Sequence, residues 1–161
     1  MRILGIDCGS QVTGYGVIES DGTRHKLVEA GIIRSRTQDS FPERIRQIGL
    51  RVREVAAQHA PDEAAVEDSF SAVNPRSALK LTQVRGATLF VLAEAGLPVS
   101  EYTPAEVKGA VVGHGRAEKE QVAFMLRSLL RLDAELSPHD ASDAVAVAVC
   151  HAVHRAVGVP R

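Results

Sequence analysis

Four acidic residues lie at positions where an unpaired charge would be costly. Asp7 ends the apolar run RILGID, and Glu67 ends the apolar run EAAVE. Asp140 and Asp143 are three residues apart in HDASDAVAVAV, so they share one face of the helix that this run predicts. Burying an unpaired carboxylate costs several kcal/mol, and a buried acid therefore needs a compensating partner.

Local structure offers such a partner to some of these acids. Asp7 could accept hydrogen bonds from amides of the turn that follows it, as Asp residues at strand ends often do. Asp140 would complement the dipole in the first turn of the predicted last helix and could pair with Ser137 in a capping box. His139 is four residues from Asp143 and could reach the same face, although a surface position is commoner for such a histidine.

The four acids are more informative as a set. Carboxylates within ~5 Å of one another disfavour each other's ionised forms, so a site that gathers all four needs a counter-charge. Oxygen ligands without cysteine favour Mg²⁺ or Mn²⁺ over Zn²⁺. Two such ions about 4 Å apart stabilise the attacking and leaving oxygens when a phosphodiester is displaced in line. The set therefore predicts metal-dependent phosphodiester chemistry.

The elements that would position these acids follow from the periodicity. Residues 2–7, 12–20 and 26–33 are predicted strands with a hairpin turn at Asp21 and Gly22. Residues 40–60 change to helical spacing, with Ser40 and Glu43 placed as a capping box. Strands are predicted at 63–68 and 97–102, and helices at 74–96, 103–112, 118–132 and 137–156. A strand meander followed by alternating strands and helices predicts an α/β domain, a mixed five-stranded sheet flanked by helices in ribonuclease H-like order.

Composition sets the broad class of protein. A chain of 161 residues with 45% hydrophobic residues predicts one globular domain over residues 1–161. We expect a cytoplasmic protein, since no apolar run approaches the roughly 20 residues of a membrane span and no signal peptide is evident. Cys8 and Cys150 are expected to be reduced and buried. Because 19 basic residues face 20 acidic ones, nucleic-acid binding would depend on local segregation of charge.

Five ordered motifs carry a resemblance that spans essentially the whole chain: GIDCGSQVTGYGVI, VEDSF, SALKLTQVRG, EVKGAVVGHGRAEKEQVAFMLRSLL and HDASDAVAVAVCHA. Together they closely resemble the RuvC family of Holliday junction resolvases. The resemblance implies a ribonuclease H-like homodimer that cuts four-way DNA junctions by two symmetric nicks with divalent metal, alongside the RuvA–RuvB branch-migration complex. The family's four catalytic acids fall on Asp7, Glu67, Asp140 and Asp143. Some relatives place a histidine at the third of these positions, so His139 is an alternative ligand to Asp140.

The resemblance also implies DNA contacts. Lys108 and Lys119 fall on family lysines implicated in catalysis and DNA binding, although exposed lysines near helix ends are usually only solvated. Phe70 matches a family aromatic that reaches the junction centre, which predicts stacking on an unpaired base, while the edge of the core is the simpler position. Arg76 and Lys80, in the first turns of the following helix, could bind phosphates.

The predicted helix 74–96 bears on assembly. Its apolar residues spread beyond the stripe that one sheet face could cover, which implies a second partner surface. A homodimer through this helix would place two active sites about one two-fold axis, matching the approximate symmetry of a four-way junction. The residues concerned are Ala78, Leu79, Leu81, Val84, Ala87, Leu89, Phe90, Val91 and Leu92.

Other protein classes are weighed against this assignment. DCGSQVTGYG also resembles the phosphate-binding hairpin of actin-like ATPases and sugar kinases, but those proteins need a duplicated domain for which this chain has no room. A related ribonuclease H-like nuclease acting on structured RNA, as in the YqgF-like branch, would use the same metal chemistry and stays open. A junction-binding protein without catalysis would have no use for four acids facing a polyanion.

Overall fold

The computed structural model describes residues 1–68 and 74–158 of the chain. Within these residues it contains a five-stranded sheet in the order β3-β2-β1-β4-β5. Strand β1 pairs antiparallel with β2 and parallel with β4, β2 pairs antiparallel with β3, and β4 pairs parallel with β5. The predicted mixed sheet is therefore confirmed. The strands are β1 (Arg2–Asp7), β2 (Val12–Ser20), β3 (His25–Arg34), β4 (Glu63–Glu67) and β5 (Val99–Tyr102).

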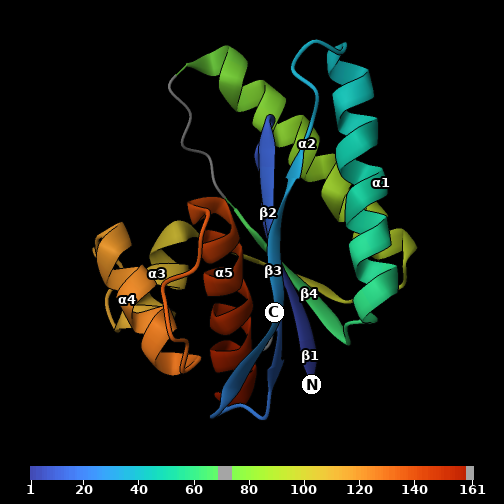
Figure 1. Ribbon diagram of the computed structural model, residues 1–161. Coiled ribbons are helices and arrows are strands. Elements are labelled where there is room, and N and C mark those ends of the chain that lie inside the picture. The colour runs from blue at the N-terminus through green and yellow to red at the C-terminus, as the bar shows by residue number, and fades with distance from the viewer. Residues whose placement is uncertain (69–73, 159–161) are drawn as a thin grey trace.

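Helices cover both faces of this sheet (Figure 1). On one face lie α1 (Phe41–His59) and α2 (Pro75–Glu94), packed against each other. On the other face α5 (His139–Ala156) crosses the strands, with α3 (Pro104–Val112) and α4 (Lys119–Leu129) packed beside it. Alternate strand residues supply two cores, because successive side chains point to opposite faces. Ile3 lies in the core beneath α5, whereas Leu4 and Ile6 lie in the core beneath α1 and α2.

Helix α5 packs directly on strand backbone. A Cβ atom on Gly5 of β1 would lie 2.2 Å from the carbonyl oxygen of Ala144, and one on Gly16 of β2 would lie 2.4 Å from Cγ2 of Val145. No side chain fits at either position, so the glycines permit an approach that any larger residue would block. The close approach fixes the height of α5 above the sheet.

A buried polar chain fixes α5 along the strands as well. Nδ1 of His151 lies 2.9 Å from the Tyr102 hydroxyl, and its Nε2 lies 2.7 Å from Oε2 of Glu63. The guanidinium of Arg155 lies 2.7 Å from the other oxygen of Glu63. Burial lowers the pKa of His151. These contacts join α5 to the start of β4 and the end of β5.

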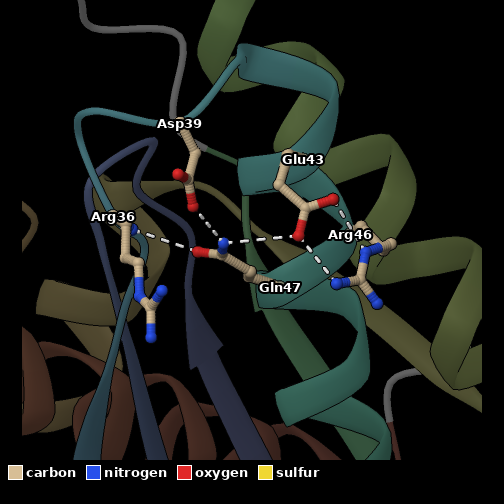
Figure 2. Close-up of polar contacts among 5 residues, drawn as sticks. All are labelled: Arg36, Asp39, Glu43, Arg46 and Gln47. Carbon is tan, nitrogen blue, oxygen red and sulfur yellow. Dashed lines mark hydrogen bonds and ion pairs between the residues drawn. The ribbon is translucent and has the colours of Figure 1, made fainter.

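The capping box predicted at the start of α1 does not form. Ser40 is the N-cap residue, but its side chain makes no cap hydrogen bond. The carboxylate of Glu43 instead accepts hydrogen bonds from the Arg46 guanidinium at 2.9 and 2.7 Å (Figure 2). Gln47 donates to Asp39 at 2.6 Å and joins the segment before the helix to its second turn. A charged partner on the same helix has displaced the capping box, because hydrogen bonds between charged groups are the stronger kind.

The other predicted helix starts gave mixed results. Thr103 and Glu106 form the predicted capping box of α3. The last helix begins at His139 with Pro138 as its N-cap and without a side-chain cap, so the prediction of Ser137 as N-cap was wrong. The amides of Ala141 and Ser142 reach the Pro138 carbonyl, which shows that this carbonyl starts the helical hydrogen bonds.

Two further observations bear on the predicted class of protein. Cys8 and Cys150 are both free and buried, as predicted. In the part of the chain that the structure describes, none of the helices combines the length and apolar character needed to cross a membrane.

Candidate active site

The site begins where two parallel strands end. Asp7 is the last residue of β1 and Glu67 the last of β4, and the register pairs Ile6 with Val66 just before them. The two acids therefore lie at the same edge of the sheet. Because Gly5 faces α5 and side chains alternate, Asp7 also faces α5.

A glycine in β2 allows the third acid to approach this edge. In the β1–β2 ladder Asp7 pairs with Gly14, and a Cβ atom on Gly14 would lie 1.9 Å from the carbonyl oxygen of Asp140. Only glycine permits this approach of the first turn of α5 to β2. Asp143 follows one turn later, half-buried, with an ion pair to Lys119. The structure thus gathers the four acids that the sequence singled out.

The pKa of Asp7 reflects its burial and the acids around it. Burial raises the pKa of Asp7 to about 8, and the charges of Glu67, Asp143 and Asp140 add to this rise. The pKa of Glu67 is raised by burial and then by Asp143. The neighbouring carboxylates make ionisation of Asp7 and Glu67 harder, because like charges at short range in a poorly solvated site repel.

Asp7 was also considered as an acceptor of hydrogen bonds from amides of the turn that follows it, and Gly9 in that turn does not support this role. The amide of Gly9 donates to Oγ1 of Thr13 at 3.3 Å, and the same hydroxyl donates back to the Gly9 carbonyl at 3.0 Å. This turn amide is therefore satisfied by Thr13. Asp7 needs a different counterpart.

Two lysines supply positive charge opposite the acids. Nζ of Lys119, the first residue of α4, lies 3.1 Å from Oδ2 of Asp143. Lys119 partly offsets the rise in the pKa of both Asp7 and Glu67, and Lys108 of α3 partly offsets the rise at Glu67. A pocket of about 280 Å³ lies between these groups, lined by Glu67, Pro104, Val107, Lys108, Lys119, Val122, Asp143 and Ala146.

The four acids supply donor atoms for a metal ion without forming a preformed cluster. Across residues 1–68 and 74–158, no group of three His, Cys, Asp or Glu side chains is placed to hold a metal ion. The donors are nevertheless carboxylate oxygens, which hard divalent cations prefer. Burial and the neighbouring carboxylates raise the pKa of Asp7 despite the nearby ammonium of Lys119. An additional cation therefore fits this donor set.

Other residues predicted from the sequence lie outside this pocket or outside the described chain. Phe70 lies outside the described residues. Arg76 is exposed in the first turn of α2, and the ammonium of Lys80 lies 5.4 Å from the centre of the Phe41 ring. His139 is exposed as the first residue of α5, whereas Asp140 contributes to the raised pKa of Asp7.

One residue near the acids was missed from the sequence. Arg85 of α2 lies 2.8 Å from Oδ1 of Asp68, the residue after Glu67. Its position, a charged residue within the apolar part of the predicted helix 74–96, is the one sequence signal that could have drawn attention to it.

Comparison with known proteins decides the family. The family model for Crossover junction endodeoxyribonuclease RuvC matches residues 3–151. The chain belongs to the RuvC family. RuvC of Alkalilimnicola ehrlichii is 53% identical over 155 residues, which cover 96% of this chain and 92% of that protein. RuvC of Geobacter metallireducens is 53% identical over 152 residues, covering 94% and 92%.

Solved structures agree with this membership. Thermus thermophilus RuvC in complex with Holliday junction substrate superimposes with a TM-score of 0.93 at 36% identity, covering 98% of this chain and 96% of that one. The yeast mitochondrial resolvase Ydc2, at 12% identity and a TM-score of 0.67, shows the shared fold. The predicted ribonuclease H-like fold and the RuvC resemblance are confirmed. As a RuvC, the chain is a crossover junction endodeoxyribonuclease, a nuclease that hydrolyses DNA phosphodiester bonds.

The crowded acids predict an unusual pH dependence of stability without metal. Folded Asp7 keeps its proton up to a pKa of about 8, whereas the unfolded chain releases it near 3.8. The unfolded state therefore binds fewer protons, and stability falls by about 1.4 kcal/mol per pH unit between these values. Asp7→Asn removes this loss. In urea unfolding with EDTA, we expect the variant to exceed the wild type by several kcal/mol at pH 8 and by little at pH 4.

Asp21→Asn is the matched control for this measurement. Asp21 lies in the exposed β2–β3 turn, where hydrogen bonds from Thr23 and Arg24 lower its pKa to about 2. Its ionised form stabilises the turn above the ordinary pKa, so this variant should lose stability at pH 8. An Asp7→Asn variant that follows the wild type from pH 4 to pH 8 would contradict the crowding at Asp7.

Proposed function

We propose that this chain resolves four-way DNA junctions by paired symmetric nicks, through metal-dependent hydrolysis at the site formed by Asp7, Glu67, Asp140 and Asp143. One observation carries the proposal: four acids from β1, β4 and α5 lie at one edge of the sheet, where burial and then the charges of Glu67, Asp143 and Asp140 raise the pKa of Asp7 to about 8. Membership of the RuvC family, in which metal use is typical, supports it.

The carboxylates are proposed to hold two Mg²⁺ or Mn²⁺ ions, which would activate a water and stabilise charge on the reacting oxygens. Between the two candidates for the fourth ligand we favour Asp140. Its backbone is held against Gly14, and its charge reaches Asp7. His139 lies exposed one residue earlier and lacks both connections to the site.

The lysines are proposed to act on the phosphate. Lys119 and Lys108 line the same pocket as Glu67 and Asp143, so their ammonium groups face the position that a bound phosphodiester would take. Preorganised cations at this position stabilise the negative charge that grows in the transition state. Lys119 also neutralises Asp143 before substrate binds.

The remaining DNA contacts stay predictions from the family resemblance. Exposed Arg76 is placed to bind phosphate, whereas Lys80 would have to leave the Phe41 ring to do so. Phe70 is predicted to stack on an unpaired base. Cooperation with the RuvA–RuvB complex is proposed on the same basis.

The homodimer is proposed to form through one face of α2. Leu79 and Phe90 are 65% and 64% exposed, and their spacing of eleven residues places them on one side of the helix. Val84 and Leu92 are fully buried in the chain's own core, so the interface lies on the opposite face to them. A two-fold axis through this surface would direct two active sites at one junction.

Phe90→Asp is expected to weaken dimerisation at least ~10²-fold, because an unpaired charge in an apolar interface costs several kcal/mol. Sedimentation at several protein concentrations would measure the change. Phe124→Asp is the matched control, since Phe124 on α4 is 62% exposed and lies away from α2. A Phe90→Asp variant that stays dimeric at the same concentrations as the control would place the interface elsewhere.

Cleavage assays test the proposed function as a whole. The protein is incubated with Mg²⁺ or Mn²⁺ and a synthetic four-way junction whose arms carry many candidate sites, and nicks are mapped on each strand. Paired nicks at symmetric positions are expected, with little cleavage of linear duplex. Preferential cleavage of structured RNA would instead favour the YqgF-like alternative.

A further inference from the structure

Arg85 is a half-buried cation that faces the strand ends from α2. Its guanidinium contacts two carboxylates, Oδ1 of Asp68 at 2.8 Å and Oε2 of Glu101. Its side chain is 17% exposed, and its neighbours Val84 and Thr88 on the same helix are fully buried. Arg85 therefore links α2 to the ends of β4 and β5 and is not a solvated surface charge.

Both carboxylates are attached to the strand ends that hold Glu67. Asp68 follows Glu67 directly, and its amide donates to the Tyr102 carbonyl at 2.8 Å, which extends the β4–β5 ladder by one residue. Glu101 precedes Tyr102 and pairs with Val66. Because side chains alternate along a strand, Asp68 points to the α2 face while Glu67 points to the α5 face. Arg85 therefore holds the residue that follows Glu67 from the opposite face of the sheet.

The same turn of α2 reaches the strand that holds Asp7. Thr88 lies against the thiol of Cys8, the residue after Asp7, and the charge of Arg85 also acts on this thiol. One helical turn thus contacts the residues that follow two of the four acids.

Resting on the proposed function, we propose that Arg85 is a positioning residue for catalysis. Its guanidinium holds Asp68 and Glu101 together and so fixes the direction of Glu67, while its helix carries the proposed dimer surface of Leu79 and Phe90. One terminal nitrogen of the guanidinium, Nη2, contacts both carboxylates. Arginine suits this half-buried position because its guanidinium is always charged and is more weakly hydrated than a lysine ammonium. A residue that orients a metal ligand typically changes metal affinity or activity 10- to 100-fold when it is removed.

The test compares Arg85→Met and Arg85→Lys with a control, Arg53→Met. Arg53 of α1 pairs with Glu94 at the far end of α2, so the control removes an exposed ion pair of the same chemistry. Mn²⁺ binding to the DNA-free protein is measured by titration calorimetry. Single-turnover nicking is measured at saturating Mn²⁺, and junction affinity in EDTA.

Arg85→Met is expected to weaken Mn²⁺ binding and to slow nicking, each by at least ~10-fold, with junction affinity unchanged. Arg85→Lys should stay impaired, because the shorter and more strongly hydrated ammonium is less suited to this half-buried position. Arg53→Met should match the wild type. Wild-type Mn²⁺ binding and nicking by Arg85→Met, even with a lowered melting temperature, would overturn the proposal and leave Arg85 as a stabilising residue only.

Asp68→Asn probes the same contact if Arg85→Met fails to fold. It preserves shape and removes only the charge that Arg85 holds, so it should reproduce the weakened Mn²⁺ binding. Wild-type Mn²⁺ binding by Asp68→Asn would overturn the proposal. Because calorimetry contains no DNA, its outcome is separate from a failure of the wild type to nick junctions, which would contradict the proposed function instead.

Discussion

Asp7→Asn and Asp143→Asn are each expected to slow junction nicking at least ~10²-fold, because either change removes a charged metal ligand while keeping shape and volume. Asp7 is partly buried, and it interacts with the other three acids. Asp143 is its half-exposed neighbour beside Lys119. The measurement is single-turnover nicking in Mg²⁺ or Mn²⁺, on variants whose unfolding has been checked.

Binding should respond in the opposite sense. Asp143→Asn deletes a negative charge that faces phosphates, so in EDTA the junction should bind this variant as tightly as before or more tightly. Asp7 has a pKa of about 8 without metal, so Asp7→Asn should leave junction binding in EDTA unchanged below that pH. If these acids only capped turns and helix starts, Asn would preserve much of the hydrogen bonding, cost about 1 kcal/mol of stability and spare activity. Near wild-type nicking by either variant would remove that residue from the metal site, and joint loss of folding and binding would make it structural.

Much of this arrangement could be predicted from the sequence because its signals are local. An apolar run that ends in an acid and a turn indicates a strand end, and this placed Asp7 and Glu67 correctly at the ends of β1 and β4. Helical spacing likewise placed Asp140 and Asp143 in the first turns of α5. These local signals do not show that the acids lie together. The sheet order does, because it places β1 beside β4.

The errors and omissions arise where two partners compete for one group, or where the partner of a residue belongs to another element. Ser40 had the spacing of a capping box, but Arg46 offered Glu43 a charged alternative. The apolar residues of α2 indicated both a core face and an outer face, but the sequence did not assign each residue to one of them. Val84 lies in the core. Arg85 was missed because its partner Asp68 comes from another element, and no periodic pattern records a contact between elements.

Chelation is the prediction with the largest expected effect on activity: EDTA should abolish nicking and leave junction binding intact. Without divalent ions the four carboxylates lose the charge that would activate water and stabilise the leaving oxygen, and no other described group at the site replaces it. The protein should stay folded, because Lys119 still neutralises Asp143 and burial keeps Asp7 protonated up to a pKa of about 8.

Three measurements on one sample separate loss of chemistry from loss of structure. Circular dichroism is used to follow folding, because the chain has no Trp whose fluorescence could report it. Gel-shift titration reports junction binding, and strand mapping reports nicking. Restored nicking on addition of excess Mg²⁺ or Mn²⁺ is the positive control. Full activity in EDTA would eliminate the metal mechanism, and would leave Lys108 and Lys119 as the charged groups on which hydrolysis depends, since they line the pocket beside Glu67.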